Sequence, residues 1–573
     1  MLICFVYSAG SRPLQVHREE SDGYYYPHIA EQVSETAHRF FAGRLTGVPA
    51  SPFLPADHPV SLGSAGDWSF PSGEPDGSWI ALKFDRERDV LSIAADVFNV
   101  QRWYYHRHGE QWYLANSLRY LFRIAEGLEI EWRAASYMLH YGYLPRRLTP
   151  LKDVFELDAS EVLTISRGVG TVSRRAHLPV HRRPVLDSGS HAEAVADTVR
   201  EAVSREIGDL DYLMLPISGG MDSRFLLGCA LSILPPEKIT TLTFGWPSSF
   251  DFRIGTRLTN RLGVKNIPLP MDDRPVGKLL RENFATAEGM YCAVPDYPVA
   301  PFREAVPPQC FVLSGYMGDP VFGSKEGSAP DEPVEGRERE MLALLRKSAT
   351  YVPWTTVASF LSDPTPDSLH LERDLQDLPG NTMQERYDFW YFGTHTTNRT
   401  HHAVTPVRSR ALFLMPFLHR RVLDLAFALP VSERLERRAY LAAMRLRYPD
   451  LFRFPTKRNF GFGAQRKEDL GVWTVRLWRK LWLTLDETLG PPLDKIIYRH
   501  PKFNYEHPRG FAAKQHQADV LTALSELKTV PAFESATLER ARAAYMARRL
   551  DINLLRCLLT VHQWLVHYGK KGG

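Results

Sequence analysis

The sequence is poor in cysteine and has no long apolar segment. Five cysteines stand among 573 residues, at positions 4, 229, 292, 310 and 557, and their spacing is not typical of a metal site. An odd number of widely spaced cysteines does not indicate a disulfide framework. No apolar run approaches the roughly 20 residues of a membrane helix. We therefore expect a reducing, cytoplasmic setting and no membrane partner.

A strong net charge and a targeting segment are also absent. The 70 basic and 66 acidic residues leave a net charge of +4, which is too small to indicate nucleic-acid binding. The apolar start of the chain has no basic residue before it and is soon followed by charged residues, so no signal peptide is expected. Partners must therefore be inferred from specific sites, and nucleic acid is not expected among them.

Two sequence patterns divide the chain at a proline-containing linker, residues 177–190. Before the linker, short segments of alternating polarity are separated by charged turns, which indicates antiparallel strands. After it, continuous apolar segments alternate with amphipathic ones, which indicates a parallel sheet covered by helices on both faces. We expect an α/β protein with one domain over residues 1–180 and a second over 190–573. The alternating segments include residues 78–85, 90–98 and 111–118.

The second domain is expected to end in a mostly helical region from about residue 380. The polar, acidic segment 326–340 contains prolines and is predicted to be a mobile surface loop. The apolar spacing of the last helical segment predicts packing in a core. Parallel strands are expected at 211–218, 239–246, 266–271 and 309–316. Helices are expected at 191–207, 221–234 and 251–263.

The segment ISGGMDS, residues 217–223, has the composition of a pyrophosphate-binding loop. Gly219 and Gly220 let the backbone approach phosphate oxygens, Ser223 supplies a hydroxyl donor, and the start of the following helix favours an anion. Asp222 would repel phosphate, but it can hold a magnesium ion that bridges phosphates. The alternative interpretation is an ordinary glycine-rich turn before a helix.

SGGMDS resembles the pyrophosphate loop of the asparagine synthetase superfamily, the PP-loop ATP pyrophosphatases. The resemblance implies a parallel sheet of the adenine nucleotide α-hydrolase kind and an enzyme that splits ATP to AMP and pyrophosphate. In those enzymes a substrate carboxylate is joined to AMP, and an amine then displaces the AMP. SGYMGDPVFG (314–323) is similar to the second signature, so Asp319 is expected to share Mg²⁺ with Asp222. FPTKRNFGFG (454–463) resembles the stretch with the catalytic lysine, here Lys457.

Two further segments extend the resemblance. Residues 242–264 are similar to the second strand beside the nucleotide, and Asp251 stands near the start of the helix that follows. Asp251 could alternatively be a simple helix cap. MPFLHRRVLDLAFALP (415–430) resembles the PFLD segment, with His419 in place of the aspartate, and we expect this change to affect a cap more than the chemistry. The resemblance implies that ATP or pyrophosphate contacts Ser218, Gly219, Gly220, Asp222, Ser223, Phe244, Gly245 and Gly315.

The amino-terminal half resembles the glutaminase domain of the same family, which implies an antiparallel sandwich like that of the N-terminal nucleophile (Ntn) hydrolases. Residues 96–105 and 115–121 are the segments that resemble it. A working glutaminase needs cysteine directly after the initiator methionine, because the free amine serves the thiol as base. Leu2 stands there instead, Cys4 is followed by FVYS, and the NGE segment that holds glutamine is missing. We expect a structural domain that releases no ammonia.

The segment SGYMGD also resembles the β-lactam synthetase signature, in which a tyrosine, here Tyr316, joins a glutamate in deprotonating the amine. Arg399 stands where that glutamate is expected, and Asp388, His401 and His402 are the alternatives. The resemblance implies an ATP-dependent amide-forming ligase. Its substrates would be a small-molecule or peptide carboxylate and an amine acceptor, with ATP and Mg²⁺ as cofactors.

Several alternatives remain open at this point. One is a lactam or macrolactam cyclase of the β-lactam or lasso-peptide kind, which would act with a precursor peptide and its processing proteins. Others are an amidotransferase for a natural-product or glycan carboxylate and a glutamine-hydrolysing asparagine synthetase. The last is a nucleotide-binding scaffold without turnover, and the intact Asp222, Asp319 and Lys457 argue against it.

Overall fold

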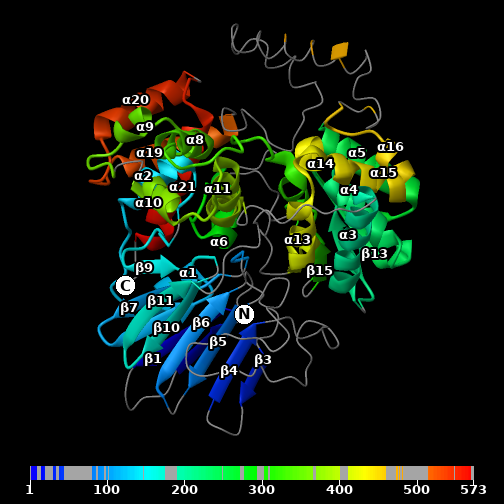
Figure 1. Ribbon diagram of the computed structural model, residues 1–573. Helices are drawn as coiled ribbons and strands as arrows, with labels where there is room; N and C mark the ends of the chain where they lie inside the picture. Colours follow the sequence, from blue (N-terminus) through cyan, green and yellow to red (C-terminus); the bar gives the residue numbers. More distant parts are fainter. Residues whose placement is uncertain are drawn as a thin grey trace.

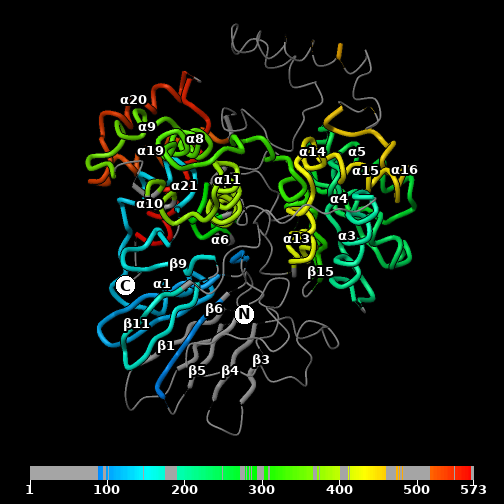
Figure 2. The backbone as a smooth tube through the Cα atoms, viewed as in Figure 1, coloured from blue at the N-terminus to red at the C-terminus, as the bar shows by residue number. Residues whose placement is uncertain are grey.

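The computed structural model contains antiparallel strands, a helical body and an α/β body. In Figure 1 the antiparallel strands lie at the bottom, helices such as α19 to α21 at the upper left and the α/β body at the right, and Figure 2 traces the same backbone. The structure describes residues 88–95, 98–100, 102–145, 147–159, 161–174, 190–208, 210–247, 249–270, 276–292, 302, 304–307, 310–365, 369–400, 411–459, 462, 473, 474, 477, 481, 514–547 and 549–569, and the backbone of strands at 2–8, 15–19, 30–33, 38–43 and 80–85.

Two antiparallel sheets form the amino-terminal part, as the alternating pattern predicted. Their strand orders are β2-β1-β8-β7-β9 and β11-β10-β6-β5-β4-β3. Cys4 lies within β1, opposite Ala115 of β8. The likeness of these sheets to an Ntn hydrolase stays an expectation. The strands are β1 Leu2–Ser8, β2 Gln15–Glu19, β3 Ala30–Val33, β4 His38–Gly43, β5 Ile80–Asp85, β6 Val90–Ala95, β7 Tyr104–His108, β8 Gln111–Ala115, β9 Val154–Glu156, β10 Glu161–Ser166 and β11 Val169–Arg174.

A parallel sheet with the order β14-β13-β12-β15-β16 follows the linker. The sequence predicted four of its strands and missed β16, because four apolar residues in a helical region carry no distinct period. Burial of β12 and β13 on nearly every residue agrees with a sheet covered on both faces. The strands are β12 Leu213–Pro216, β13 Ile239–Gly245, β14 Lys265–Pro270, β15 Cys310–Leu313 and β16 Ala411–Leu414.

Helix α3 (His191–Ile207) has the bounds that its sequence predicts. Ser190 is its N-cap and accepts a hydrogen bond from the Glu193 amide at 3.3 Å. Val195, Val199 and Val203 recur at every fourth position and are buried. They join the core of the parallel sheet, together with residues of the neighbouring helices. These helices are α4 Asp222–Leu231, α5 Phe250–Leu262, α13 Arg420–Ala428, α15 Arg438–Arg447 and α16 Pro449–Arg453.

A second core lies within the helical body and draws on both sides of the linker. Helix α21 (Ile552–Tyr568) packs here, as its apolar spacing predicted. Within the described part of the chain, no helix is both long and apolar enough to span a bilayer. The division at 180 to 190 stays an expectation, and packing across it is extensive. The other helices of this core are α1 Leu118–Ile124, α2 Ala134–Tyr141, α6 Val276–Ala287, α8 Glu338–Ala349, α9 Trp354–Ala358, α10 Leu369–Asp377, α11 Met383–Trp390, α19 Lys514–Leu527 and α20 Ser535–Met546.

A buried carboxylate also joins the two sides of the linker. Glu288 accepts hydrogen bonds from the amides of Leu118 at 3.0 Å and Arg119 at 3.3 Å, at the start of α1. A carboxylate at this position satisfies amides that have no partner within the helix and interacts favourably with the helix dipole. The amino-terminal part is therefore fastened to the helical body by specific contacts as well as by apolar packing.

Residues 326–340 lie mostly at the surface, as predicted, their mobility stays a prediction, and the last three of them begin α8. The segment runs along the start of α11, where the amide of Met383 donates to Glu332 O at 2.9 Å and that of Gln384 donates to Pro330 O at 3.0 Å. Its first residue, Glu326, is buried in an ion pair with Arg434. These contacts hold a segment whose other side chains are mostly exposed.

Candidate active site

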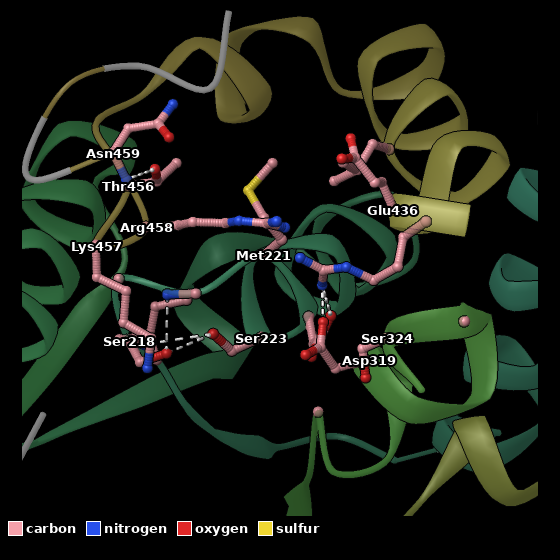
Figure 3. A pocket seen from close by; sticks show the side chains of 18 of the residues that line it. Ser218, Met221, Ser223, Asp319, Ser324, Glu436, Thr456, Lys457, Arg458 and Asn459 are labelled. Carbon is pink, nitrogen blue, oxygen red and sulfur yellow. Dashed lines mark hydrogen bonds and ion pairs between the residues drawn. The ribbon is translucent and has the colours of Figure 1, made fainter. Parts of the chain in front are cut away.

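A cavity of about 990 Å³ lies at the carboxyl ends of β12, β13 and β15. Ligands of open α/β sheets bind at this end of the strands. Figure 3 shows Ser218 and Lys457 on one side, Asp319 and Ser324 on the opposite side, and Met221 and Ser223 between them. The lining residues are 216–223, Phe244, Gly315, Asp319, Gly323, Ser324, Glu326, 435–438, Leu441 and 456–459. Among the described residues expected to contact the ligands, Gly245 and Tyr316 lie outside this lining.

The SGGMDS loop is held by its own hydroxyl groups. The Ser218 amide donates to Ser223 Oγ at 3.3 Å, and the Gly220 amide donates to Ser218 Oγ at 3.1 Å. Helix α4 begins directly after Met221, whose side chain makes no capping hydrogen bond. The first amides of α4 therefore lack a side-chain acceptor from the N-cap and face the cavity end, an arrangement that suits an anion.

Asp251 joins the loop to Lys457. Its carboxylate is 4% exposed; Oδ1 accepts the Gly219 amide at 2.9 Å, and Oδ2 lies 3.1 Å from Lys457 Nζ. The Lys457 amide in turn donates to Gly219 O at 3.1 Å. Ser249 is the N-cap of α5, so the alternative of Asp251 as a simple cap is wrong. An acid in the first turn of a helix is common, so the sequence carried little sign of this role.

Gly219 favours the close approach of the lysine segment. A Cβ atom on Gly219 would lie 3.1 Å from Lys457 Cβ and 3.3 Å from Ile254 Cδ1. The second signature approaches the same loop closely. A Cβ atom on Gly315 would lie 2.9 Å from the Ser223 amide nitrogen, and one on Gly318 would lie 3.0 Å from Asp222 Cγ. These glycines therefore allow three distant segments to meet.

The two predicted metal ligands converge on one cation, the guanidinium of Arg437. Arg437 forms an ion pair with Asp319, and its NH1 atom lies 3.9 Å from Asp222 Oδ1. Asp222 Oδ1 also accepts the hydroxyl of Tyr440 at 2.9 Å. The surrounding protein raises the pKa of Asp222, although 22% of its side chain is exposed, and Arg437 and then Tyr440 act in the opposite direction.

These residues fit a magnesium ion that arrives with a nucleotide. Within the described residues, no cluster of three or more histidine, cysteine, aspartate or glutamate side chains could hold a metal ion. Mg²⁺ commonly takes only one or two carboxylates and completes its shell with phosphate oxygens and water. Asp222 and Asp319 supply that pair, and both already face a positive charge.

The sequence did not predict Arg437, which reaches the site through an unusual turn. Glu436 and Arg437 both have positive φ, 54° and 61°, without glycine or asparagine to signal it. The turn follows Arg434, whose side chain is 2% exposed. Its Nε atom lies 2.8 Å from Glu326 Oε2. Arg434 NH1 also donates to Ala426 O at 2.6 Å. Buried contacts thus hold the turn that places Arg437 beside the carboxylates.

The residues considered for handling the amine each have contacts of their own in the structure. Tyr316 is half-buried against the core of the parallel sheet, and its amide donates to Ser314 Oγ at 3.3 Å. Arg399 lies over the ring of Tyr351, with its Cζ atom 4.9 Å from the ring centroid. Asp388 is buried and accepts Gln384 Nε2 at 2.9 Å. His401 and His402 lie outside the described residues.

The expectation that His419 affects a helix cap is corrected by the structure. His419 occupies the N-cap position of α13 but makes no capping hydrogen bond with its side chain. Its Nε2 atom instead lies 2.8 Å from Glu206 Oε1 of α3, and both side chains are buried. The residue fastens α13 to α3.

Comparison with known proteins agrees with this geometry. The family model for asparagine synthase matches residues 194–481, half of the chain. Asparagine synthetase 1 (glutamine-hydrolysing) of Bacillus subtilis is 23% identical over 251 residues, 43% of this chain and 39% of that protein. Carboxyethyl-arginine beta-lactam-synthase of Streptomyces clavuligerus is 25% identical over 182 residues, 31% of this chain and 35% of that protein. A putative asparagine synthetase 2 of Methanocaldococcus jannaschii is 22% identical over 44% of this chain and 50% of that protein.

The chain thus spans half or less of the length of the curated relatives it matches. A solved structure of a glutamine phosphoribosylpyrophosphate amidotransferase from B. subtilis covers 61% of this chain at 10% identity, but its TM-score of 0.18 carries no argument about the fold. The family match contains the loop at 217–223, Asp319 and Lys457, which line one cavity. The chain belongs to the asparagine synthase family, which includes ATP-dependent amide-forming ligases.

Proposed function

We propose that the protein is an ATP-dependent amide-forming ligase that adenylates a substrate carboxylate and releases pyrophosphate before an amine attacks. The observation that supports this most is the meeting of three distant segments at one cavity. The SGGMDS loop, Asp319 and Lys457 all line it, and Asp251 contacts both the loop and Lys457. A scaffold that had lost turnover would have no need to keep this arrangement.

Each residue then has a distinct role. The amides at the start of α4 and the hydroxyl of Ser223 bind the phosphates, and Gly219 lets Lys457 approach the same loop. Asp222 and Asp319 would hold Mg²⁺, which would offset charge on the phosphates. Lys457 stabilises negative charge that develops on the departing pyrophosphate or on the tetrahedral species formed by the amine.

Arg437 adds a second cation on the other side of the loop. In the structure its single positive charge offsets part of the negative charge of the two carboxylates. With nucleotide bound, the guanidinium of Arg437 would be placed to donate to a phosphate oxygen, beside the carboxylates that would hold Mg²⁺. Arginine suits that exchange because its planar fork binds carboxylates and phosphates equally well.

The amine is proposed to come from solution or from the substrate itself rather than from glutamine. Leu2 stands in place of the nucleophilic cysteine, and Cys4 lies inside strand β1 between two paired strands. The narrower alternative, a cyclase that joins an amine and a carboxylate of one substrate, draws on Tyr316 in SGYMGD and on the beta-lactam-synthase relative. A peptide or small-molecule carboxylate remains the proposed substrate class.

The proposal is tested by pyrophosphate release with ATP, Mg²⁺ and a panel of carboxylates, with ammonium, free amines or glutamine supplied in turn. The decisive readout is transfer of ¹⁸O from a labelled carboxylate to AMP, because only adenylation moves that atom. We expect transfer that is abolished in Asp222→Asn and retained in Asp450→Asn, an exposed acid on α16. Nucleotide binding without pyrophosphate release would support the scaffold instead. Product formation driven by glutamine in ammonia-free buffer would support a glutamine-hydrolysing synthetase.

A further inference from the structure

Arg224, the residue directly after SGGMDS, is fully buried and has no acidic partner in the part of the chain that the structure describes. Among the described residues, the hydrogen bonds of its guanidinium go to backbone carbonyls. NH1 lies 3.0 Å from both Leu451 O and Phe454 O, and NH2 lies 2.7 Å from Pro455 O. Burial lowers the pKa of Arg224 to about 10, so the group still carries its charge at neutral pH.

Burying the guanidinium of Arg224 costs desolvation free energy, which its contacts must offset. The positive end of the α4 dipole lies at its first turn, where Arg224 stands, so the charge is unfavourable for α4 itself. It is favourable for α16, whose last carbonyls it satisfies. Leu451 belongs to α16 and Phe454 is its C-cap residue. The side chain therefore acts as a C-terminal cap supplied by another helix.

The same face of α4 makes a second close contact with this region. Gly228 lies one turn after Arg224, and a Cβ atom there would lie 2.7 Å from the ring of Tyr448, which precedes α16. The hydroxyl of Tyr448 lies 3.5 Å from Cys229 Sγ. Two successive turns of α4 thus hold the segment from 448 to 455.

The held segment leads directly to the lysine of the site. Two residues after Pro455, the amide of Lys457 donates to Gly219 O at 3.1 Å, and its Nζ atom lies 3.1 Å from Asp251. Pro455 and Lys457 are therefore both fixed to the unit formed by α4 and its preceding loop, Pro455 through Arg224 and Lys457 through its backbone amide. Little freedom is left for the residues between them.

We infer that Arg224 is a positioning residue: by binding the carbonyls of residues 451, 454 and 455, it sets Lys457 at a fixed place against the pyrophosphate loop. Its effect on turnover rests on the proposed function. Its effect on the placement of Lys457 does not. Helix α4 carries the pyrophosphate loop at its start and, through Arg224, holds the segment that leads to Lys457. Arg224 thus couples ligand binding at the start of α4 to Lys457, which stands more than 200 residues later in the sequence.

The test compares Arg224→Met and Arg224→Lys with the wild type and with Arg445→Met, an exposed arginine on α15. Hydrogen exchange of backbone amides gives a readout that needs no activity. We expect exchange of the Lys457 amide to become at least about tenfold faster in Arg224→Met, while the strands of the parallel sheet stay protected. Arg224→Lys keeps the charge, but one ammonium group cannot bind three carbonyls at once, so an intermediate effect is expected.

Kinetics supply the second readout. Misplacing Lys457 should lower kcat for pyrophosphate release about 10- to 100-fold, with the KM for ATP changed by less than about threefold, because the loop itself remains. Unchanged kcat and unchanged Lys457 exchange in Arg224→Met would overturn the inference, as would faster exchange throughout the sheet. If Arg224→Met does not fold, Arg224→Lys decides on the same criteria. If the wild type releases no pyrophosphate, the proposed function fails, and exchange alone decides the role of Arg224.

Discussion

Replacing Asp251 with asparagine tests the link between the loop and the lysine. The change keeps the size of the side chain and one oxygen, which can still accept the Gly219 amide now 2.9 Å away. The second oxygen becomes an NH₂ group that faces Lys457 Nζ, at present 3.1 Å from the carboxylate. The variant therefore removes the ion pair selectively and leaves the loop contact in place.

The magnitude follows from the environment of the pair. A hydrogen bond to a charged group contributes about 1.5 to 3 kcal/mol. Lys457 is 33% exposed, so solvent screens part of this interaction, and about 1 to 2 kcal/mol is a reasonable expectation. Since about 1.4 kcal/mol corresponds to a factor of ten, kcat/KM for pyrophosphate release should fall about 5- to 30-fold.

A double-mutant cycle separates this effect from a general loss of structure. Lys457→Met should lower kcat about 10²- to 10³-fold, as the loss of a preorganised charge does at other sites. If Asp251 acts through the lysine, Asp251→Asn should have little further effect in the Lys457→Met background. The assay is steady-state pyrophosphate release over a range of ATP concentrations, with Asp450→Asn as the exposed control. Equal losses in both backgrounds would refute the reasoning and assign Asp251 to the loop alone.

Three further outcomes are expected. Arg437→Gln removes the cation between the two carboxylates, so Mn²⁺, used as a probe for Mg²⁺, should bind the nucleotide-free protein at least about threefold more tightly by electron paramagnetic resonance; unchanged binding would show that the guanidinium does not compete with metal. Gly315→Ala places a Cβ atom 2.9 Å from the Ser223 amide nitrogen and should lower the free energy of unfolding in urea by about 1 to 3 kcal/mol; wild-type stability would contradict the close approach. Burial lowers the pKa of His395 to about 3, so the unfolded chain takes up its proton near pH 6.5 while the folded one does not. Stability should therefore fall below pH 6.5 by up to about 1.4 kcal/mol per pH unit from this residue, and His395→Gln should flatten that slope; equal slopes would refute it.

Features that depend on neighbouring residues along the chain could be predicted from the sequence. The continuous apolar segments predicted four strands of the parallel sheet, and the amphipathic stretch after the proline-containing linker predicted α3. The SGGMDS loop could be recognised because its features are the residues themselves, two glycines and an acid between a strand and a helix. Neighbours along the chain are enough to specify such elements.

Contacts between distant segments were decided only by the tertiary structure. Arg437 enters the site through two left-handed residues that no residue type announces, and Asp251 and Arg224 have ordinary positions in first turns of helices. Their roles come from partners some 200 residues away, Lys457 for Asp251 and Pro455 for Arg224. The burial of the Glu326 side chain likewise depends on Arg434, which stands more than 100 residues later. A side chain's burial and charge partners arise from packing, which the order of residues along one segment does not contain.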